Sequence, residues 1–360
     1  MQVALVPWDE RIKQNNIYTP KDKIHVDSHV LLKRAFLEHG DDINTIDMYD
    51  NLSDIDFFLF YKIDVKLLKK LKALGLSNRC IYCNGEPPVV KAINSEKGYQ
   101  KLKHIFPYIM TWNDDLVDNV RIFKRNIPYH FIKQFGKVEF SKRKLLINIS
   151  GNKHSRHPQE LYSEREKVVT FFEKNYPDEI TLYGIDWSKK KHLSYQGIIG
   201  NKTEVYHHHK FALSLENMRD VKGYVTEKLL DCFVAGIVPI YMGASNIKEF
   251  IPAECYIVYE QFKSLSDLAN YLKSISEYDY QSYINAISRY LDTGIKDVFS
   301  SELYYSQIKV ITKNKSMASF SITPYGMLLL WTWQITSSLN NSYEFIRRLL
   351  GKARRRLVKI

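Results

Sequence analysis

The sequence predicts an α/β fold of two Rossmann-like domains, and three observations carry this prediction. The chain has 360 residues, of which 45% are hydrophobic and 26% charged, which suffices for two or three domains with real cores. Short apolar runs alternate with amphipathic stretches of helical spacing, a pattern typical of a parallel sheet. The pattern restarts at Lys144, after a connector rich in Lys and Arg that spans Lys133–Arg143. We therefore expect two domains face to face, with ligands bound in the crevice between them.

The first unit, residues 1–143, is expected to alternate strands and helices up to the connector. The apolar runs predict strands at Gln2–Pro7, Ile55–Ile63, Arg79–Cys83 and Tyr108–Trp112. Apolar residues at helical spacing predict helices at Ser28–His39, Asp64–Leu74 and Ser95–Ile105. Strands joined by helices run parallel, so their carboxyl ends meet at one edge of the sheet.

The second unit, residues 144–300, repeats this alternation. Strands are predicted at Leu145–Ser150, Ile180–Tyr183, Phe211–Leu215, Val238–Met242 and Tyr256–Tyr259, with a helix at Glu160–Lys174. Residues 301–360 are expected to form a separate trailing region, with a helix at Ser301–Ile311 followed by an amphipathic helical tail.

The charge is concentrated at the carboxyl terminus. Lys and Arg outnumber Asp and Glu by 52 to 40, giving +12, and residues 341–360 hold seven basic residues and one acidic residue, or +6. Apolar residues recur between these charges, and an apolar stretch at Tyr325–Ile335 precedes them. Such a segment favours contact with an anionic membrane surface. Packing on the protein's own body or in an oligomer and a nucleic-acid arm are the alternatives, and nucleic acid is not the partner we expect.

Cysteine usage and hydropathy point to a reducing compartment. Four cysteines in a chain of this length do not make a disulfide framework. The first residues lack a signal-peptide pattern, and no apolar run approaches the length of about 18 residues that spans a bilayer. We expect a cytoplasmic protein that associates peripherally with the inner face of the membrane.

The stretch Phe211–Gly243 predicts an anion site. A strand ends at Glu216 and Asn217, Thr226 is a good N-cap for the next helix, and Gly236 closes that helix. Lys228 lies in the first turn, where it is unfavourable with the helix dipole unless an anionic ligand binds there. Glu227 beside it has a carboxylate suited to sugar hydroxyls. Taken alone, these two residues would read as a solvated surface pair.

These residues resemble the donor-binding signature of the family 10 glycosyltransferases, the α-1,3/4-fucosyltransferases. The matching segments are Ser150–Asn152, Leu182–Gly184, Leu215–Asn217, Gly223–Lys228, Ala235–Ile240, Asn246 and Phe250–Pro252. The resemblance implies a GT-B fold, in which the C-terminal Rossmann-like domain holds GDP-fucose as the donor substrate. It also implies a set of donor-binding residues, with Arg165 on the diphosphate: Asn152, Arg165, Tyr183, Asn217, Tyr224, Glu227 and Lys228.

A candidate base lies in the first unit. Pro87 and Pro88 end any helix, so Glu86 follows its strand directly and faces the crevice. By resemblance, Glu86 is the general base that takes the proton of an acceptor hydroxyl. The resemblance implies inverting transfer of fucose to an N-acetylglucosamine-type residue of a glycan such as a Lewis antigen or lipopolysaccharide O-antigen, most often with α-1,3 linkage.

No metal or other cofactor is expected. Asp54 and Asp56 have the spacing of a metal-binding pair but precede their strand, and His207–His209 are consecutive, so they do not converge. Cys80 and Cys83 share a predicted strand, so their thiols point to opposite faces. Two alternatives to fucosyl transfer remain open: a transferase for another nucleotide sugar, and a basic membrane- or nucleic-acid-binding protein without chemistry.

Overall fold

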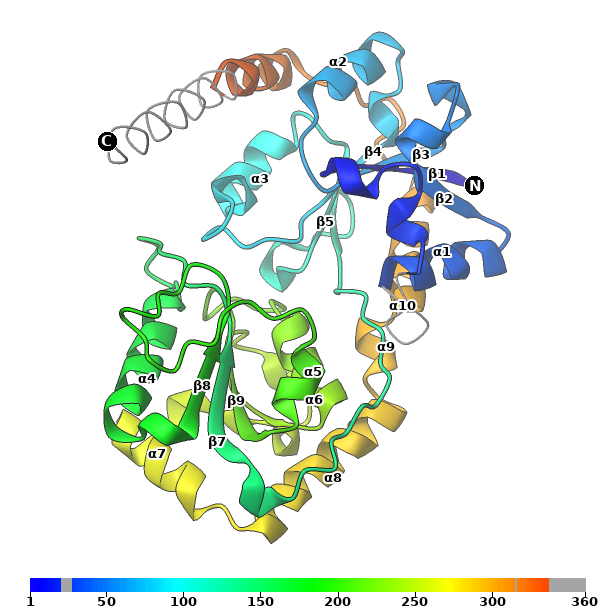
Figure 1. Cartoon of the computed structure of the whole chain (residues 1–360). Helices are drawn as coiled ribbons and strands as arrows, with labels where there is room; N and C mark the ends of the chain where they lie inside the picture. Colours follow the sequence, from blue (N-terminus) through cyan, green and yellow to red (C-terminus); the bar gives the residue numbers. More distant parts are fainter. Residues whose placement is uncertain (21–27, 315, 337–360) are drawn as a thin grey trace, which may run out of the picture.

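The structure is a computed structural model that describes residues 1–20, 28–314 and 316–336. It contains two parallel sheets, one in each half of the molecule (Figure 1). The N-terminal sheet has the strand order β2-β1-β3-β4-β5-β6. Its strands are β1 (Gln2–Val6), β2 (Asp42–Thr45), β3 (Phe57–Phe60), β4 (Cys80–Cys83), β5 (Tyr108–Thr111) and β6 (Ile122–Lys124).

Helices cover both faces of the N-terminal sheet. On one face, α2 (Val65–Ala73) and α3 (Glu96–Leu102) form a core with the sheet, and Cys80 belongs to it. On the other face, α1 (Ser28–Glu38) forms a second core, which contains Cys83. The two thiols are buried and free on opposite faces, as the alternation of the strand predicts.

The C-terminal sheet has the order β11-β10-β9-β7-β8. Its strands are β7 (Lys144–Ile149), β8 (Ile180–Tyr183), β9 (His209–Leu215), β10 (Val238–Met242) and β11 (Ile257–Val258). In Figure 1, helices α4 and α7 lie on one side of this sheet and α5 and α6 on the other. The helices are α4 (Tyr162–Asn175), α5 (Lys202–Tyr206), α6 (Glu227–Ala235), α7 (Leu265–Ser274), α8 (Glu277–Thr293) and α9 (Lys296–Phe299).

Each sheet is doubly wound, with one point where the strand order reverses. In the N-terminal sheet this point lies between β1 and β3, and in the C-terminal sheet between β7 and β9. In open parallel sheets, ligands bind beyond the carboxyl ends of the strands at such switch points. The fold therefore offers one crevice in each domain.

The chain passes between the domains twice, and the two crossings lie side by side (Figure 1). After β6 the connector runs past α9 and alongside α8 to the start of β7 (Figure 1). The Tyr129 amide donates to the Phe299 carbonyl oxygen at 2.7 Å, and the Asn126 side-chain amide donates to the Val298 carbonyl oxygen at 2.6 Å. The two crossings are therefore hydrogen-bonded to each other where the chain passes between the domains.

Residues 301–336 do not form the separate trailing region that the sequence predicts. Helix α10 (Ser301–Lys313) packs on α1 and buries Tyr304 and Ile308 in the core of the N-terminal domain. Residues 324–336 are helical and pack Leu330 on the opposite face of the same sheet. This part of the chain returns to the first domain because its apolar residues complete both cores. The basic tail at residues 341–360 lies outside the described residues.

The predicted strands and helices are otherwise confirmed, with ends shifted by a few residues. The sequence prediction missed β2 and β6. Both are short, and β2 (Asp42–Thr45) carries polar residues, so neither has the apolar run by which a strand is recognised.

We expect acidification to destabilise the C-terminal domain through His209. This side chain is 4% exposed, its ring contacts the Val205 carbonyl oxygen and Thr181 Oγ1, and burial lowers its pKa from 6.5 to about 4. Between these pH values the unfolded chain binds a proton that the folded chain does not. The free energy of unfolding therefore falls as the pH drops through this window, by about 3 kcal/mol in full.

Urea titrations at pH 7.5 and 5 measure this loss. His209→Gln is expected to reduce the pH dependence relative to the wild type, because glutamine does not titrate. Equal losses in both proteins would show that other groups account for the acid sensitivity.

Candidate active site

A cavity of about 120 Å³ lies between the two domains, beyond the carboxyl ends of β4, β5, β6 and β9. It is smaller than the roughly 300 to 1,000 Å³ of pockets for drug-sized ligands. A larger ligand must therefore extend beyond it, or the domains must part to admit the ligand. The lining residues are Gly85, Glu86, Trp112, Lys124, Arg125, Asn126, Ile127, Asn217, Gly223, Tyr224, Val225, Thr226, Glu227, Lys228, Phe250 and Phe299.

Two buried asparagines hold the backbone of Glu86 on the N-terminal wall of this cavity. The Glu86 amide donates to Asn84 Oδ1 at 3.0 Å, and Asn94 Nδ2 donates to the Glu86 carbonyl oxygen at 2.7 Å. Asn84 donates in turn to the Tyr99 hydroxyl at 2.5 Å, and Asn94 accepts from the Tyr82 hydroxyl at 3.0 Å. A buried hydrogen-bond network in which the polar groups have partners holds its residues in one conformation. The Glu86 carboxylate is thus carried into the cavity on a rigid turn.

The amino end of α6 forms the opposite wall. Thr226 caps this helix, with its Oγ1 facing the Lys228 amide, and Gly236 ends it at φ +71°, so both predicted caps are confirmed. Glu216, fully buried at the end of β9, accepts from the Thr226 amide and hydroxyl at 2.7 Å each. Glu216 therefore ties the start of the helix to the end of the strand.

Charges converge at this helix end. Lys228 Nζ lies 3.5 Å from Glu216 Oε2, 3.6 Å from Glu227 Oε1 and 3.3 Å from Thr226 Oγ1. Burial raises the pKa of Glu216 above its usual value. Burial alone would raise the pKa of Glu227 too, but Lys228 and Lys202 outweigh it and its pKa lies below the usual range. Glu227 is thus held ionised, as an acceptor for hydroxyl groups.

Arg165 lies behind this wall rather than in the lining of the cavity. Its side chain is 2% exposed. Nε and Nη2 donate to the Leu215 carbonyl oxygen at 3.1 and 2.7 Å, and Nη2 donates to the Glu216 carbonyl oxygen at 2.5 Å and to Asn217 Oδ1 at 3.0 Å. In this conformation Arg165 holds the end of β9 in place. Its predicted contact with a diphosphate stays a prediction.

Asn217 and Tyr224 connect Arg165 to the cavity. Asn217 Nδ2 lies 3.4 Å from the Tyr224 hydroxyl, and the Tyr224 ring packs on Trp112 with centroids 4.7 Å apart. Both residues line the cavity, and their predicted contact with the donor stays a prediction. The Trp112 indole N–H is buried and has no partner among the described residues, and it lines the same cavity.

The two domains are also fastened to each other at the rim of the cavity. Asp114 accepts from Lys124 and from Asn246 Nδ2, the latter at 3.0 Å, and Asn246 Oδ1 accepts from the Gly223 amide at 2.8 Å. Gly223 has φ +79°, and a Cβ there would lie 2.2 Å from the Trp112 carbonyl oxygen. Only glycine allows this approach. Asn246, which belongs to the family-like segments, thus bridges the domains.

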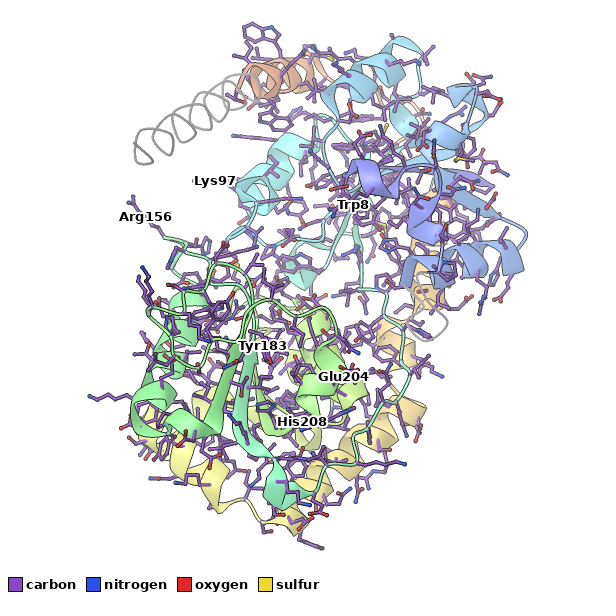
Figure 2. All side chains as sticks on the ribbon, in the orientation of Figure 1. Trp8, Lys97, Arg156, Tyr183, Glu204 and His208 are labelled. Atoms are coloured by element: carbon purple, nitrogen blue, oxygen red, sulfur yellow. The ribbon has the colours of Figure 1, made fainter. Side chains whose placement is uncertain are left out.

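Asn152 and Tyr183 are not brought to the cavity. Asn152 follows β7, and Tyr183 ends β8, which pairs with β7 through Ile149. Figure 2 labels Tyr183 in the C-terminal domain, at the carboxyl end of its strand. Asn152 Oδ1 is buried without a partner among the described residues. Both residues therefore lie along the strand ends beyond the enclosed volume, where a longer ligand would extend.

The candidate metal ligands of the sequence do not converge. Asp54 and Asp56 are exposed at the amino end of β3, and Asp56 accepts from the Gln2 amide. Among His207, His208 and His209 only the last is buried. Within the described residues there is no group of three or more His, Cys, Asp or Glu placed to hold a metal ion.

Sequence reasoning missed the residues that follow β5 and β6. Trp112, Lys124 and Arg125 line the cavity, but β6 (Ile122–Lys124) went unrecognised, so the sequence analysis did not mark Lys124 and Arg125 as residues at the end of a strand. The sequence feature that could have revealed this strand end is the position of Lys124 and Arg125 directly after the apolar pair Ile122 and Phe123.

The fold and the position of the cavity define a class of protein. Two doubly wound domains with a site between them make a GT-B fold, and a solved α1,3-fucosyltransferase with GDP has it too, with a TM-score of 0.58 over 90% of this chain and 92% of that one at 17% identity. A second solved structure, of α1,3-fucosyltransferase with GDP-fucose, has a TM-score of 0.54 over 87% of this chain and 90% of that one at 15% identity.

Sequence comparison adds a family match for the C-terminal domain. Residues 140–299 match the family model described as glycosyltransferase family 10 (fucosyltransferase), C-terminal part. The resemblance to glycosyltransferase family 10 is therefore confirmed over these residues, which include all the family-like segments around the start of α6.

Two curated relatives indicate how far the similarity reaches. The 4-galactosyl-N-acetylglucosaminide 3-α-L-fucosyltransferase 9 of Mus musculus is 31% identical over 193 residues, 51% of this chain and 47% of that protein. The α-(1,4)-fucosyltransferase of Arabidopsis thaliana is 44% identical over 70 residues, 19% of this chain and 17% of that protein. The matches thus span half or less of these relatives.

Proposed function

We propose that the protein is an inverting fucosyltransferase that moves L-fucose from GDP-fucose to a hydroxyl of an N-acetylglucosamine-type residue, with α-1,3 linkage. The observation that carries the proposal is the placement of Glu86 and Lys228 on opposite walls of one cavity, each on a different domain. The family match and the printed activities of the relatives support the choice of donor.

The donor side is assigned to the C-terminal domain. The positive end of the α6 dipole and the Lys228 ammonium favour a diphosphate. Asn217, Tyr224 and the ionised Glu227 surround the same space and suit the hydroxyl groups of a sugar. Arg165 would reach the diphosphate from behind the wall, and Asn152 and Tyr183 would meet the nucleotide farther along the strand ends.

The acceptor side is assigned to the N-terminal domain. A sugar hydroxyl has a pKa far above 7, so it needs a base as it attacks the anomeric carbon, and the Glu86 carboxylate takes that proton. The new bond forms on the face opposite the leaving GDP, so the configuration inverts. Positive charge and backbone amides stabilise the diphosphate as it leaves.

The proposed reaction needs no metal ion, because the charge that develops on the leaving diphosphate is met by Lys228, Arg165 and the helix amides. Added EDTA is therefore expected to leave turnover within about twofold of the untreated rate. GDP release from GDP-fucose in the presence of acceptor measures it. Loss of activity with EDTA that manganese restores would contradict this part of the proposal.

The test of the function is an assay of the full chain with N-acetyllactosamine as the acceptor. GDP release that depends on the acceptor, together with an α-fucoside in the NMR spectrum of the product, is expected. GDP-mannose and UDP-glucose in parallel reactions test the donor. Transfer from either of these in place of GDP-fucose would overturn the choice of donor, and no transfer at all would overturn the function.

We propose further that the protein works in the cytoplasm at an anionic membrane surface. The helix at residues 324–336 presents apolar side chains to solvent at helical spacing, and none of residues 316–343 is charged. The exposed set is Tyr325, Leu328, Trp331 and Ile335. The basic tail follows this helix in the sequence. In the described part of the chain, no helix is long and apolar enough to cross a bilayer.

Deleting residues 341–360 is expected to release the protein from vesicles that contain anionic lipid. The segment carries +6, and each basic residue near such a surface contributes on the order of 1 kcal/mol. Binding of the full chain should also weaken between 0.1 and 1 M salt, where the Debye length falls from about 10 to about 3 Å. Co-sedimentation with anionic and with neutral vesicles measures both effects. Truncated protein that binds as before would place the contact elsewhere.

A further inference from the structure

The switch point of the N-terminal sheet carries aromatic side chains that the proposed reaction does not use. Strand order reverses between β1 and β3, and crevices at such points hold ligands. Trp8 follows β1 and Tyr61 follows β3 directly. Figure 2 labels Trp8, which lies in the N-terminal domain. An aromatic pair therefore occupies the place where this domain would bind a ligand.

The aromatic pair reaches from solvent to the cavity of Glu86. The rings of Trp8 and Tyr61 have centroids 5.2 Å apart, and Trp8 is 38% exposed. The Arg125 guanidinium lies over Tyr61 at 5.5 Å and over Tyr304 at 5.2 Å. Arg125 itself lines the cavity that contains Glu86. Trp8, Tyr61 and Arg125 thus contact one another in a row, which we call the aromatic ledge.

Arg125 keeps hydrogen-bonding capacity on this ledge. In the described part of the chain its guanidinium donates to two neutral oxygens, the Asn84 carbonyl at 3.2 Å and the Tyr304 hydroxyl at 3.4 Å. A guanidinium has five N–H donors. The remaining donors, beside aromatic faces, match a ligand with hydroxyl oxygens at its edge and apolar C–H groups on its face. A sugar ring has this chemistry.

We infer that the aromatic ledge binds the second sugar of the acceptor glycan, the residue attached to the one that Glu86 deprotonates. This inference rests on the proposed function. The sugar stacks one face on the exposed ring of Trp8, from which the Tyr61 ring is tilted by 55°, while Arg125 donates to its hydroxyl oxygens. Trp8 does not line the cavity of Glu86, so it sets affinity for an extended acceptor and not the rate of the chemical step.

Trp8→Ala tests the inference with two acceptors that differ by one sugar, methyl β-N-acetylglucosaminide and its 4-galactosyl derivative. The KM for the disaccharide is expected to rise about tenfold, because a lost aromatic contact weakens binding by about that factor. The KM for the monosaccharide, kcat and the Kd for GDP should stay within about twofold. Trp8→Phe, which keeps a ring, should recover most of the disaccharide affinity.

Trp331→Ala is the matched control, since Trp331 is an exposed tryptophan on the helix at residues 324–336. It should change neither KM. If Trp8→Ala raises both KM values equally, or neither, while the wild type transfers fucose, the inference is overturned and the proposed function stands. If the wild type transfers fucose to neither acceptor, the proposed function is overturned, and the inference with it.

Discussion

Glu86→Gln is expected to lower kcat by about 10² to 10⁴ while leaving the affinity for GDP unchanged. The amide keeps the size of the carboxylate but cannot take the proton of the attacking hydroxyl. Because Asn84 and Asn94 hold only the backbone of this residue, the substitution should leave the turn in place. Steady-state kinetics and calorimetric titration with GDP measure the two quantities.

Two further variants separate chemistry from structure. Glu96→Gln alters an exposed carboxylate at the start of α3 in the same domain and should have the wild-type kcat. Asn94→Ala keeps the Glu86 carboxylate but removes the hydrogen bond to the Glu86 carbonyl oxygen. Both kcat and the melting temperature should therefore fall. Glu86→Gln with an unchanged kcat would remove Glu86 from the catalytic role.

Lys228→Ala is expected to raise the Kd for GDP by about 10- to 100-fold, the effect of one hydrogen bond to a charged group. Lys228 is the ammonium on the cavity wall at the start of α6, and the diphosphate is common to substrate and product. Calorimetric titration of GDP measures the change. A wild-type Kd would place the donor site elsewhere.

The matched control for this variant is Lys222→Ala. Lys222 lies in the loop before α6, is half-exposed and pairs with Asp115 at 2.9 Å, so its loss should change the Kd for GDP little. Arg165 is the poorer test of donor binding, because its removal leaves the carbonyl oxygens of Leu215 and Glu216 buried without donors. Such a loss destabilises the fold itself.

Much of the cavity wall at the start of α6 was predictable because its signals are local. Thr226 and Gly236 mark the ends of α6 by their own conformational preferences, and Lys228 and Glu227 follow from the position of the cap. The turn at Glu86 was predictable for the same reason, since two prolines prevent a helix from following the strand.

The partners of these residues were not predictable. Asn84 and Asn94 are ten residues apart in sequence, and only the packing of α3 on β4 shows that they hold one carbonyl and one amide of the same residue. Asp114, Lys124 and Asn246 meet across the domains, so no local pattern reports them.

By itself, the sequence determined two parallel α/β domains, the helix end that suits a phosphate, and the carboxylate that faces it, because periodicity and capping act within a few residues along the chain. Only the tertiary structure decided that residues 301–336 complete the first domain, that Arg165 donates hydrogen bonds to the end of β9, and that the rings of Trp8 and Tyr61 contact each other. These outcomes depend on which distant surfaces bury each other, and burial is a property of the assembled chain.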